Sequence, residues 1–398
     1  MKTTEPIHAS PAARVTLVMS ALFGTTGVIL VFLPRWLAGE RGLSGAEIGA
    51  VLSLSQFARV LTGPAIAAWA DAVQDRRTPL RLVSIAAACA YLAFFTLAHD
   101  FLSLLAIGFV ALSLTSSLTP LIEAATLRAT AEGRIPYGLA RGIGSVSFIT
   151  ANILGGFAVA RFGLGAVVVW VLCGLSLLAL SSWTALKLDP RPPGAPHAHV
   201  LSGMQTLLRS RRFVTLVLAC GLIQSAHAFY YNFSVLVWRG QGFSPEMIGW
   251  LWAFGGAVEV AFLWNLARFE RRVRPEALIL IGAGGGALRW FCMGFGPTSA
   301  VLWPLQALHV CSFASAHVGA MRLLHREAPP SASAMAQTLY AVTSAGVLMG
   351  ASTLLSGFLF DHVGAGGYWA MSAMAFAGGC LAVPLLKPAS HTAPATPR

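Results

Sequence analysis

Charged side chains lie inside long apolar segments of this 398-residue chain, where an ion is costly to place. They are Arg59, Glu123, Arg141, Glu259 and Arg289. A charge near the centre of a bilayer costs at least ~2.5–3.5 kcal/mol, so it tends to face a cavity or an opposite charge. A shielded carboxyl group can exchange protons, and a guanidinium can hold a carboxylate by two hydrogen bonds. These residues predict a polar site within apolar helices, with structural ion pairs or snorkelling to the interface as the alternatives.

Polar and aromatic side chains repeat at helical spacing beside these charges. Residues three or four positions apart share one face of a helix. Three such faces are Gln306, His309, Phe313 and His317; Gln224, His227, Tyr231 and Ser234; and Arg141, Ser145, Phe148 and Asn152. Imidazoles change charge near neutral pH, and flat rings pack against apolar molecules. The faces therefore predict the walls of one small-molecule site, although an intramembrane histidine can equally be a packing residue.

The residue types suggest three roles within this candidate site. We expect proton exchange at Glu259, His309, His317 and Glu123. We expect substrate contacts from Arg289, Arg141, His227, Tyr230, Tyr231, Gln224, Asn152, Trp252 and Phe313. We expect a conformational gate that includes Arg59. Glu123 and Arg141 are equally suited to a gate ion pair.

No cofactor or metal ion is expected. The six cysteines lie singly inside apolar runs, and no carboxylate cluster offers ligands for a divalent ion. The glycine-rich run 282–289 lacks the residues of a phosphate-binding loop, so ion gradients rather than ATP would drive any uphill step. An intramembrane enzyme using Ser312 and His309 is the alternative from another class. No nucleophile elbow accompanies this pair, so we expect no enzyme activity.

The composition assigns these residues to a polytopic α-helical membrane protein. Of the residues, 56% are hydrophobic and 11% are charged, whereas a soluble domain carries about 25% charged residues. The mean hydropathy is +0.70, and many apolar runs approach the ~20 residues that cross a bilayer as a helix. We expect twelve spans: 14–37, 46–69, 79–98, 101–125, 138–160, 164–187, 212–237, 246–267, 276–296, 298–322, 333–359 and 366–386.

The basic residues indicate the orientation of these spans. When both termini and the loops after even-numbered helices are assigned to the cytoplasm, those segments hold 20 of the 27 basic residues. The net charge of +12 therefore indicates cytoplasmic loops rather than nucleic-acid binding. The polar, Pro-rich region 188–211 is expected to be a cytoplasmic linker. It would join an N-terminal bundle, 1–187, to a C-terminal bundle with a short tail, 212–398.

An internal repeat relates the two expected bundles. The stretch 42–59 returns at 242–259 with an offset of 200, and 154–163 matches 355–364 with an offset of 201. Because each copy has six helices, both copies begin on the same side of the membrane and form a parallel repeat. The first stretch ends on an arginine and its copy on a glutamate, so these two residues could attract across or beside a central cavity.

The chain resembles the major facilitator superfamily along its whole length. Four segments are similar to the phenylpropionate permease family of proton-coupled carriers: YGLARGIGSVSF (137–148), IQSAHAFYYNFS (223–234), ALRWFCMG (287–294) and LQALHVCSFASAH (305–317). The order of the intramembrane charges resembles that of lactose permeases, but Ser312 stands where those carry an acid. The resemblance implies an all-α fold of two pseudo-symmetric six-helix bundles. The loop after the second span carries a degraded form of the superfamily's motif, so the resemblance also implies a conformational gate at Asp71, Arg76 and Arg77.

The residues and the resemblance together predict a secondary transporter that imports a small aromatic carboxylate, such as 3-phenylpropionate, with protons. It would work by alternating access, as a monomer, in a cell membrane and most naturally the bacterial inner membrane. Its partners would be the small-molecule substrate, protons and the lipid bilayer. The alternatives are proton-coupled uptake of a nucleoside or sugar, and efflux of amphipathic compounds. The cavity is expected between helices 1, 4, 5, 7, 8 and 10.

Overall fold

The fold was analysed in a computed structural model that describes residues 11–72, 77–131, 133, 135–185, 200–270, 272–329 and 332–387. These residues form helices and short connections, with no β-strand among them. Within this part of the chain, nine helical stretches are long and apolar enough to cross a membrane, by length and composition. The all-α fold expected from the sequence is therefore confirmed.

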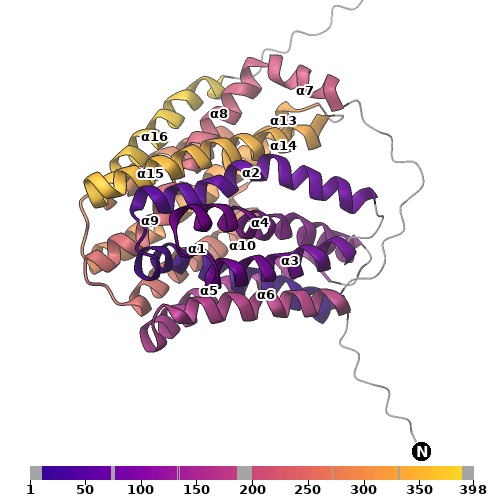
Figure 1. The fold of residues 1–398 in the computed structure, drawn as a ribbon. Helices are drawn as coiled ribbons and strands as arrows, with labels where there is room; N and C mark the ends of the chain where they lie inside the picture. The colour runs from indigo at the N-terminus through magenta and orange to yellow at the C-terminus, as the bar shows by residue number, and fades with distance from the viewer. Residues whose placement is uncertain are drawn as a thin grey trace, which may run out of the picture.

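The first half of the chain folds into six long helices, which match the first six expected spans (Figure 1). They are α1 (Pro11–Glu40), α2 (Gly45–Ala72), α3 (Arg77–Thr96), α4 (Phe101–Ala131), α5 (Tyr137–Phe162) and α6 (Gly165–Ala185). The helix α1 packs against α5 and α6, while α4 packs against α2 and α3. An aromatic cluster of Trp36, Tyr91, Phe94 and Phe95 fills the interior of this half.

The second half begins with a short helix inside the expected linker and then builds the remaining spans. Its elements are α7 (Val200–Arg209), α8 (Arg211–Ser225), α9 (Ala228–Gly240), α10 (Pro245–Glu270), α11 (Pro275–Met293), α12 (Ser299–Ala307), η1 (Val310–Ser315), α13 (Ala316–Glu327), α14 (Ser333–Ala341), η3 (Val342–Leu348), α15 (Met349–Val363), η4 (Gly364–Gly366), α16 (Gly367–Ala382) and η5 (Val383–Leu386). Leu207 of α7 is buried in a cluster with Phe213 and Tyr340. The expected linker therefore includes a helix that docks onto the second half.

Three of the expected spans are interrupted rather than continuous. The seventh breaks at the turn of Ala226 and His227, between α8 and α9. The tenth contains Pro304, which lacks an amide hydrogen, and then a π-helical segment, η1. The eleventh contains a second π-helical segment, η3. Such irregular turns re-aim side chains and backbone groups within a helix, and they are common at functional sites.

The internal repeat has a direct structural meaning at the starts of α2 and α10. Gly42 has φ 65° and Gly242 has φ 87°, in the left-handed region that glycine adopts readily, so each reverses the chain. The next matched residue, Ser44, accepts a hydrogen bond from the Glu47 amide, and Glu47 caps Ser44 in return. In the second copy, Ser244 accepts a hydrogen bond from the amide of residue 247. The repeat thus encodes the same turn and helix start twice.

The last matched glycine of each copy lets the two halves touch. Gly49 of α2 faces the backbone of α15, where an added Cβ would lie 3.0 Å from the Thr353 carbonyl oxygen. Gly249 of α10 faces the Asn152 carbonyl of α5 with no space for a Cβ. Small residues allow such close backbone contact between membrane helices, where packing rather than hydrophobic exclusion drives association. The α2–α15 and α5–α10 contacts are therefore pseudo-equivalent.

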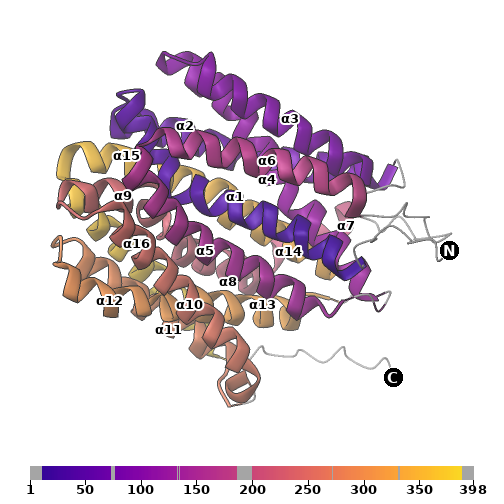
Figure 2. The ribbon, with the colours of Figure 1, turned by 90° about the horizontal axis from the view of Figure 1, so that it is seen from below.

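Hydrogen bonds join the two halves at one end of the bundle. We call the end that carries the start of α1 and the end of η5 the terminal end, and the opposite end the distal end; the start of α1 and α7 mark the terminal end at the right of Figure 2. At the distal end, Asp361 of α15 accepts hydrogen bonds from the amides of Gly45 (2.7 Å) and Ala46 (2.8 Å) at the start of α2. A carboxylate suits a helix N-terminus, so this contact helps to close the distal end.

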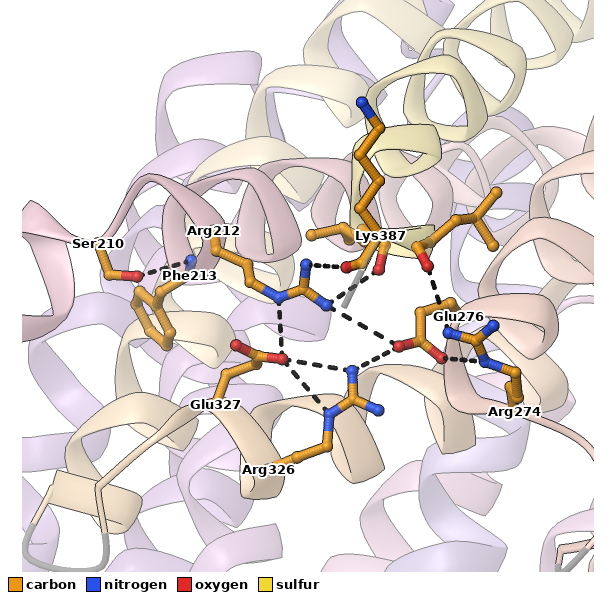
Figure 3. Close-up of polar contacts among 10 residues, drawn as sticks. Ser210, Arg212, Phe213, Arg274, Glu276, Arg326, Glu327 and Lys387 are labelled. Carbon is orange, nitrogen blue, oxygen red and sulfur yellow. Dashed lines mark hydrogen bonds and ion pairs between the residues drawn. The ribbon is translucent and has the colours of Figure 1, made fainter. Parts of the chain in front are cut away.

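An ion-pair network ties together the helix ends of the second half at the terminal end (Figure 3). The buried carboxylate of Glu276 pairs with Arg326 and, at 3.7 Å, with Arg274, while Glu327 lies 2.9 Å from Arg212. Arg212 also donates to backbone carbonyls of the C-terminal η5 segment. Burial lowers the pKa of Arg326, but hydrogen bonds and charge from the carboxylates outweigh burial and raise it. The network therefore joins α8, α11, α13 and η5.

Candidate functional site

A cavity of about 300 Å³ lies between the two halves. The first half contributes side chains of α1 and α5, and the second half contributes side chains of α9 and α10, together with His309 just before η1 and Phe313 within it. The residues that line it include Phe23, Arg141, Ser145, Phe148, Tyr230, Tyr231, Trp252, Glu259, His309 and Phe313. Most of the wall is aromatic or aliphatic, with a few polar groups, as in small-molecule sites generally.

Stacked rings form the wall that the second half presents to this cavity. Tyr230 stacks on Trp252 with ring centroids 4.5 Å apart, and Trp252 is fixed by a hydrogen bond to Ser234. On the tenth span, His309 stacks on Phe313 at 5.2 Å with an interplanar angle of 9°. His317 continues that stack one turn further, as the spacing of this face predicts. The flat, rigid walls suit an apolar ring.

Arg289 of α11 is completely buried behind these rings and is held by three hydrogen bonds. Its Nη1 donates to Nδ1 of His309 (3.0 Å) and Oγ of Ser312 (3.2 Å), and its Nη2 donates to Oε1 of Gln306 (2.8 Å). The guanidinium also lies over the rings of Tyr230 and Trp290. The buried cation is therefore stabilised by electron-rich ring faces and by acceptors at Nη1 and Nη2, while its Nε has no hydrogen-bond partner among the described residues.

The hydrogen bond from Arg289 fixes the protonation state of His309. A guanidinium only donates, so Nδ1 of His309 must accept, and the ring proton sits on Nε2. That Nε2 lies 3.2 Å from Oε2 of Glu259, whose side chain is 23% exposed toward the cavity. The result is a chain of three groups, with the Arg289 cation inside, the neutral imidazole between, and the Glu259 carboxylate at the wall. Charge compensation runs through the imidazole.

Further polar groups support this chain from behind. Nδ1 of His227 donates to the Gln224 carbonyl (3.0 Å), which leaves its Nε2 to accept from Ser312, 3.2 Å away. The Tyr230 hydroxyl donates to Gln306 at 2.9 Å. The helix break at His227 and the π turn around Ser312 bring these groups together. Ser312, where lactose permeases have an acid, contacts both His227 and Arg289.

On the other side of the cavity, Arg141 is paired within the first half. Its Nε lies 3.3 Å from Oε1 of Glu123, and its Nη1 donates to Ser145 at 3.1 Å. The guanidinium lies 4.4 Å from the ring centre of Phe23, and Tyr137 donates to the second oxygen of Glu123 at 2.9 Å. The cation therefore faces the cavity but is already neutralised.

A second cavity of about 300 Å³ adjoins the first on the side of the first half. Phe23, Leu30 and Phe148 line both cavities. The second one is otherwise bounded by further side chains of α1, by side chains of α2, α3 and α4, and by Asn232 of α9. Arg59 lines it, so Arg59 and Glu259, which the repeat would have allowed to attract each other, face different cavities. Helices 2 and 3 thus join the six expected to surround the central space.

Several residues expected at the site do not line the main cavity. His227 and Gln224 are buried behind its wall, whereas His317 is exposed but lies outside the lining. Asn152 is also fully buried, at the contact with α10, with neither amide atom hydrogen-bonded. The gate residue Arg76 lies outside the described residues, and the side chains of Asp71 and Arg77 are likewise not described.

Three further residues take part in the site, although none of them was assigned one of the three roles. Gln306 was visible in a polar stripe but was given no role, and it accepts from both Arg289 and Tyr230. Tyr137 and Phe23 orient the Glu123–Arg141 pair. The sequence offered the helical face of Gln306 as a signal, whereas an isolated phenylalanine in an apolar helix offers none.

Two repeated helical halves around a central cavity with buried charges define a membrane transporter of the major facilitator fold. Residues 14–371 match the model of a protein family described as "MFS_1 like family". The chain belongs to this family. It is thus a multi-pass membrane protein whose relatives are transporters rather than enzymes.

Individual relatives agree on the class and differ in cargo. The chain is 30% identical over 357 residues to a probable 3-phenylpropionic acid transporter of Escherichia coli K12, covering 89% of this chain and 92% of the relative. It is 26% identical to a maltose permease of Geobacillus stearothermophilus, with 94% and 93% covered. A substituted form of the nucleoside transporter NupG shares the fold with a TM-score of 0.82, 16% identity, and coverage of 95% and 100%.

Proposed function

We propose that this transporter imports a small aromatic carboxylate, of the 3-phenylpropionate type, together with protons. The observation that carries the proposal is the chain from Arg289 through His309 to Glu259 at an aromatic cavity wall. The 30% identity to a probable 3-phenylpropionic acid transporter supports the choice of substrate. The aromatic rings of the wall suit the phenyl group.

The charge balance of the chain gives a reason for coupling. With Glu259 ionised, its negative charge compensates buried Arg289 across the His309 ring. When Glu259 takes a proton, it no longer compensates that cation, and the site gains one net positive charge. A carboxylate substrate would restore the balance, so proton and anion favour each other's binding. Such coupling is reciprocal, because each ligand changes the affinity for the other by the same factor.

The closed distal end fits one state of an alternating-access cycle. If both termini are cytoplasmic, as the basic residues predict, the hydrogen bonds of Asp361 seal the outer face and the site faces inward. Rocking of the bundles 1–187 and 212–398 about the cavity, through the linker 188–211, would expose it outward. We propose a monomer in the bacterial inner membrane as the working unit.

Uptake into proteoliposomes tests this function. Wild-type protein should accumulate radiolabelled 3-phenylpropionate against its gradient when a proton gradient is imposed, and a sodium gradient alone should not support accumulation. Glu259→Gln should reduce proton-driven accumulation at least tenfold, because the carboxamide no longer takes up a proton. The variant should still exchange internal for external substrate. Glu246→Gln, the same change in the first turn of α10, is the matched control.

The outcome separates the proposal from its alternatives. Full accumulation by Glu259→Gln, or accumulation driven by sodium, would refute proton coupling at this residue. Uptake of a nucleoside or maltose with no competition from 3-phenylpropionate would favour the neutral-substrate alternative, which the maltose permease relative and the nucleoside transporter neighbour support. Proton-dependent expulsion of amphipathic dyes without uptake would favour efflux.

A further inference from the structure

The second cavity contains a cation that the site described so far does not use. Arg59 of α2 lines this cavity, and no carboxylate is among the described residues that line it. Within the described residues, Arg59 makes no hydrogen bond or ion pair, and it is exposed to the space that it faces. A cation without a counter-charge raises the free energy of an apolar span. An anion that binds it therefore gains more binding free energy than an anion at a cation that is already paired.

The other two intramembrane arginines differ from Arg59 in this respect. Arg289 is completely buried and donates to Gln306, His309 and Ser312. Arg141 is paired with Glu123. A carboxylate that bound either of them would have to displace existing partners, whereas Arg59 offers a planar fork with two parallel donors.

The surroundings of Arg59 suit the polar end of an amphipathic anion. Gln56, one turn earlier on α2, faces the same cavity, and its side-chain amide has no partner among the described residues. Thr115 and Ser116 also line the cavity, and their hydroxyls donate to backbone carbonyls of their own helix. These neutral hydroxyls do not neutralise the guanidinium as a carboxylate would. Phe23 and Phe148 form the wall shared with the main cavity and offer ring faces beside this polar end.

We propose that Arg59 binds the carboxylate of the transported substrate, so that the binding site extends from the ring-lined main cavity into the second cavity. The proposal rests on the proposed function for the aromatic ring of the substrate, whereas the binding of the carboxylate is argued from Arg59 itself. It changes the role expected for Arg59 from the sequence, which was a conformational gate. The carboxylate would then restore the net charge of the site from Arg59, while the Arg289–His309–Glu259 chain takes up the proton.

The test compares acids with their uncharged amides on purified full-length protein. Dissociation constants are measured by tryptophan fluorescence for 3-phenylpropionate and 3-phenylpropionamide, and for a panel of other monocarboxylates with matched amides. Wild-type protein should prefer the acid by about tenfold or more, as expected for a charge-assisted hydrogen-bond pair. Arg59→Gln should reduce this preference to about threefold or less while leaving amide binding unchanged. Arg161→Gln, an exposed arginine of α5, should behave as wild type.

Each result decides the proposal. An unchanged acid preference in Arg59→Gln, with slower transport, would return Arg59 to a gating role and overturn the proposal. If that variant does not fold, Arg59→Lys keeps the charge but loses the fork, and a preference equal to wild type would overturn it. If another acid in the panel is selected instead of 3-phenylpropionate, the proposed substrate fails, and the same comparison on that acid decides the role of Arg59. Wild-type protein that selects no acid would refute both proposals.

Discussion

Replacing Arg289 by lysine keeps the buried charge but removes the planar fork that organises the site. The guanidinium makes three hydrogen bonds, of 2.8, 3.0 and 3.2 Å, from two nitrogens. A lysine nitrogen stands at the level of the arginine Cζ, one bond short of both Nη1 and Nη2, so we expect it to keep one of them. Hydrogen bonds to charged groups contribute about 1.5–3 kcal/mol each, so two lost bonds cost about 3–6 kcal/mol. Because Gln306 still accepts from Tyr230, we expect the lower end, about 3 kcal/mol.

Thermal unfolding of the purified protein measures this cost. At about 2 °C per kcal/mol for a long chain, the apparent Tm of Arg289→Lys should fall by about 6 °C. The variant should also lose proton-driven uptake, because His309 Nδ1 is no longer held as an acceptor and its Nε2 proton is no longer directed at Glu259. Arg161→Lys, on an exposed position, should change the Tm by no more than about 1 °C. An Arg289→Lys protein with the stability and uptake of wild type would refute this account of the network.

Two further predictions concern the ends of the bundle. Gly357→Ala places a Cβ against the Gly45 carbonyl, so it should hold the distal end apart and increase the labelling of cysteines introduced there. Gly284→Ala, which has open space around its Cβ, should not increase this labelling. Equal labelling in both variants would contradict the close contact. Glu276→Gln removes the buried carboxylate shared by Arg326 and Arg274, so it should lower the free energy of unfolding by about 1.5–3 kcal/mol. Thermal unfolding measures this loss, and a ligand-binding assay should show unchanged substrate affinity. Unaltered stability would show that the network contributes little.

The positions of the helices could be read from the sequence to within a few residues, but their interruptions could not. Hydropathy placed all of the spans because each must match the thickness of a bilayer. No proline or glycine stands at the break at His227, so the sequence gives no local signal for it and only the folded chain shows it. The π turn at Ser312 is similar, since it is stabilised by contacts to Arg289 and His227 from other helices.

The members of the candidate site were also partly visible in advance. Glu259, Arg289 and His309 were recognisable because charged and titratable groups are rare in apolar spans. Their order was not, because the sequence allowed Arg289 to pair with Glu259 directly, and the fold instead inserts the His309 ring between them. Asn152 and His227, which looked like cavity residues from their spacing, lie behind the wall.

The sequence by itself determined the class of fold, the spans and the duplication, because hydropathy and repeated turn residues such as Gly42 and Gly242 act locally along the chain. Only the tertiary structure decided which face of each helix meets which neighbour. That choice depends on helix rotation and crossing, which are set by contacts between residues far apart in sequence, such as Gly249 against Asn152. For this reason Arg59 and Glu259, equivalent in the repeat, face different cavities.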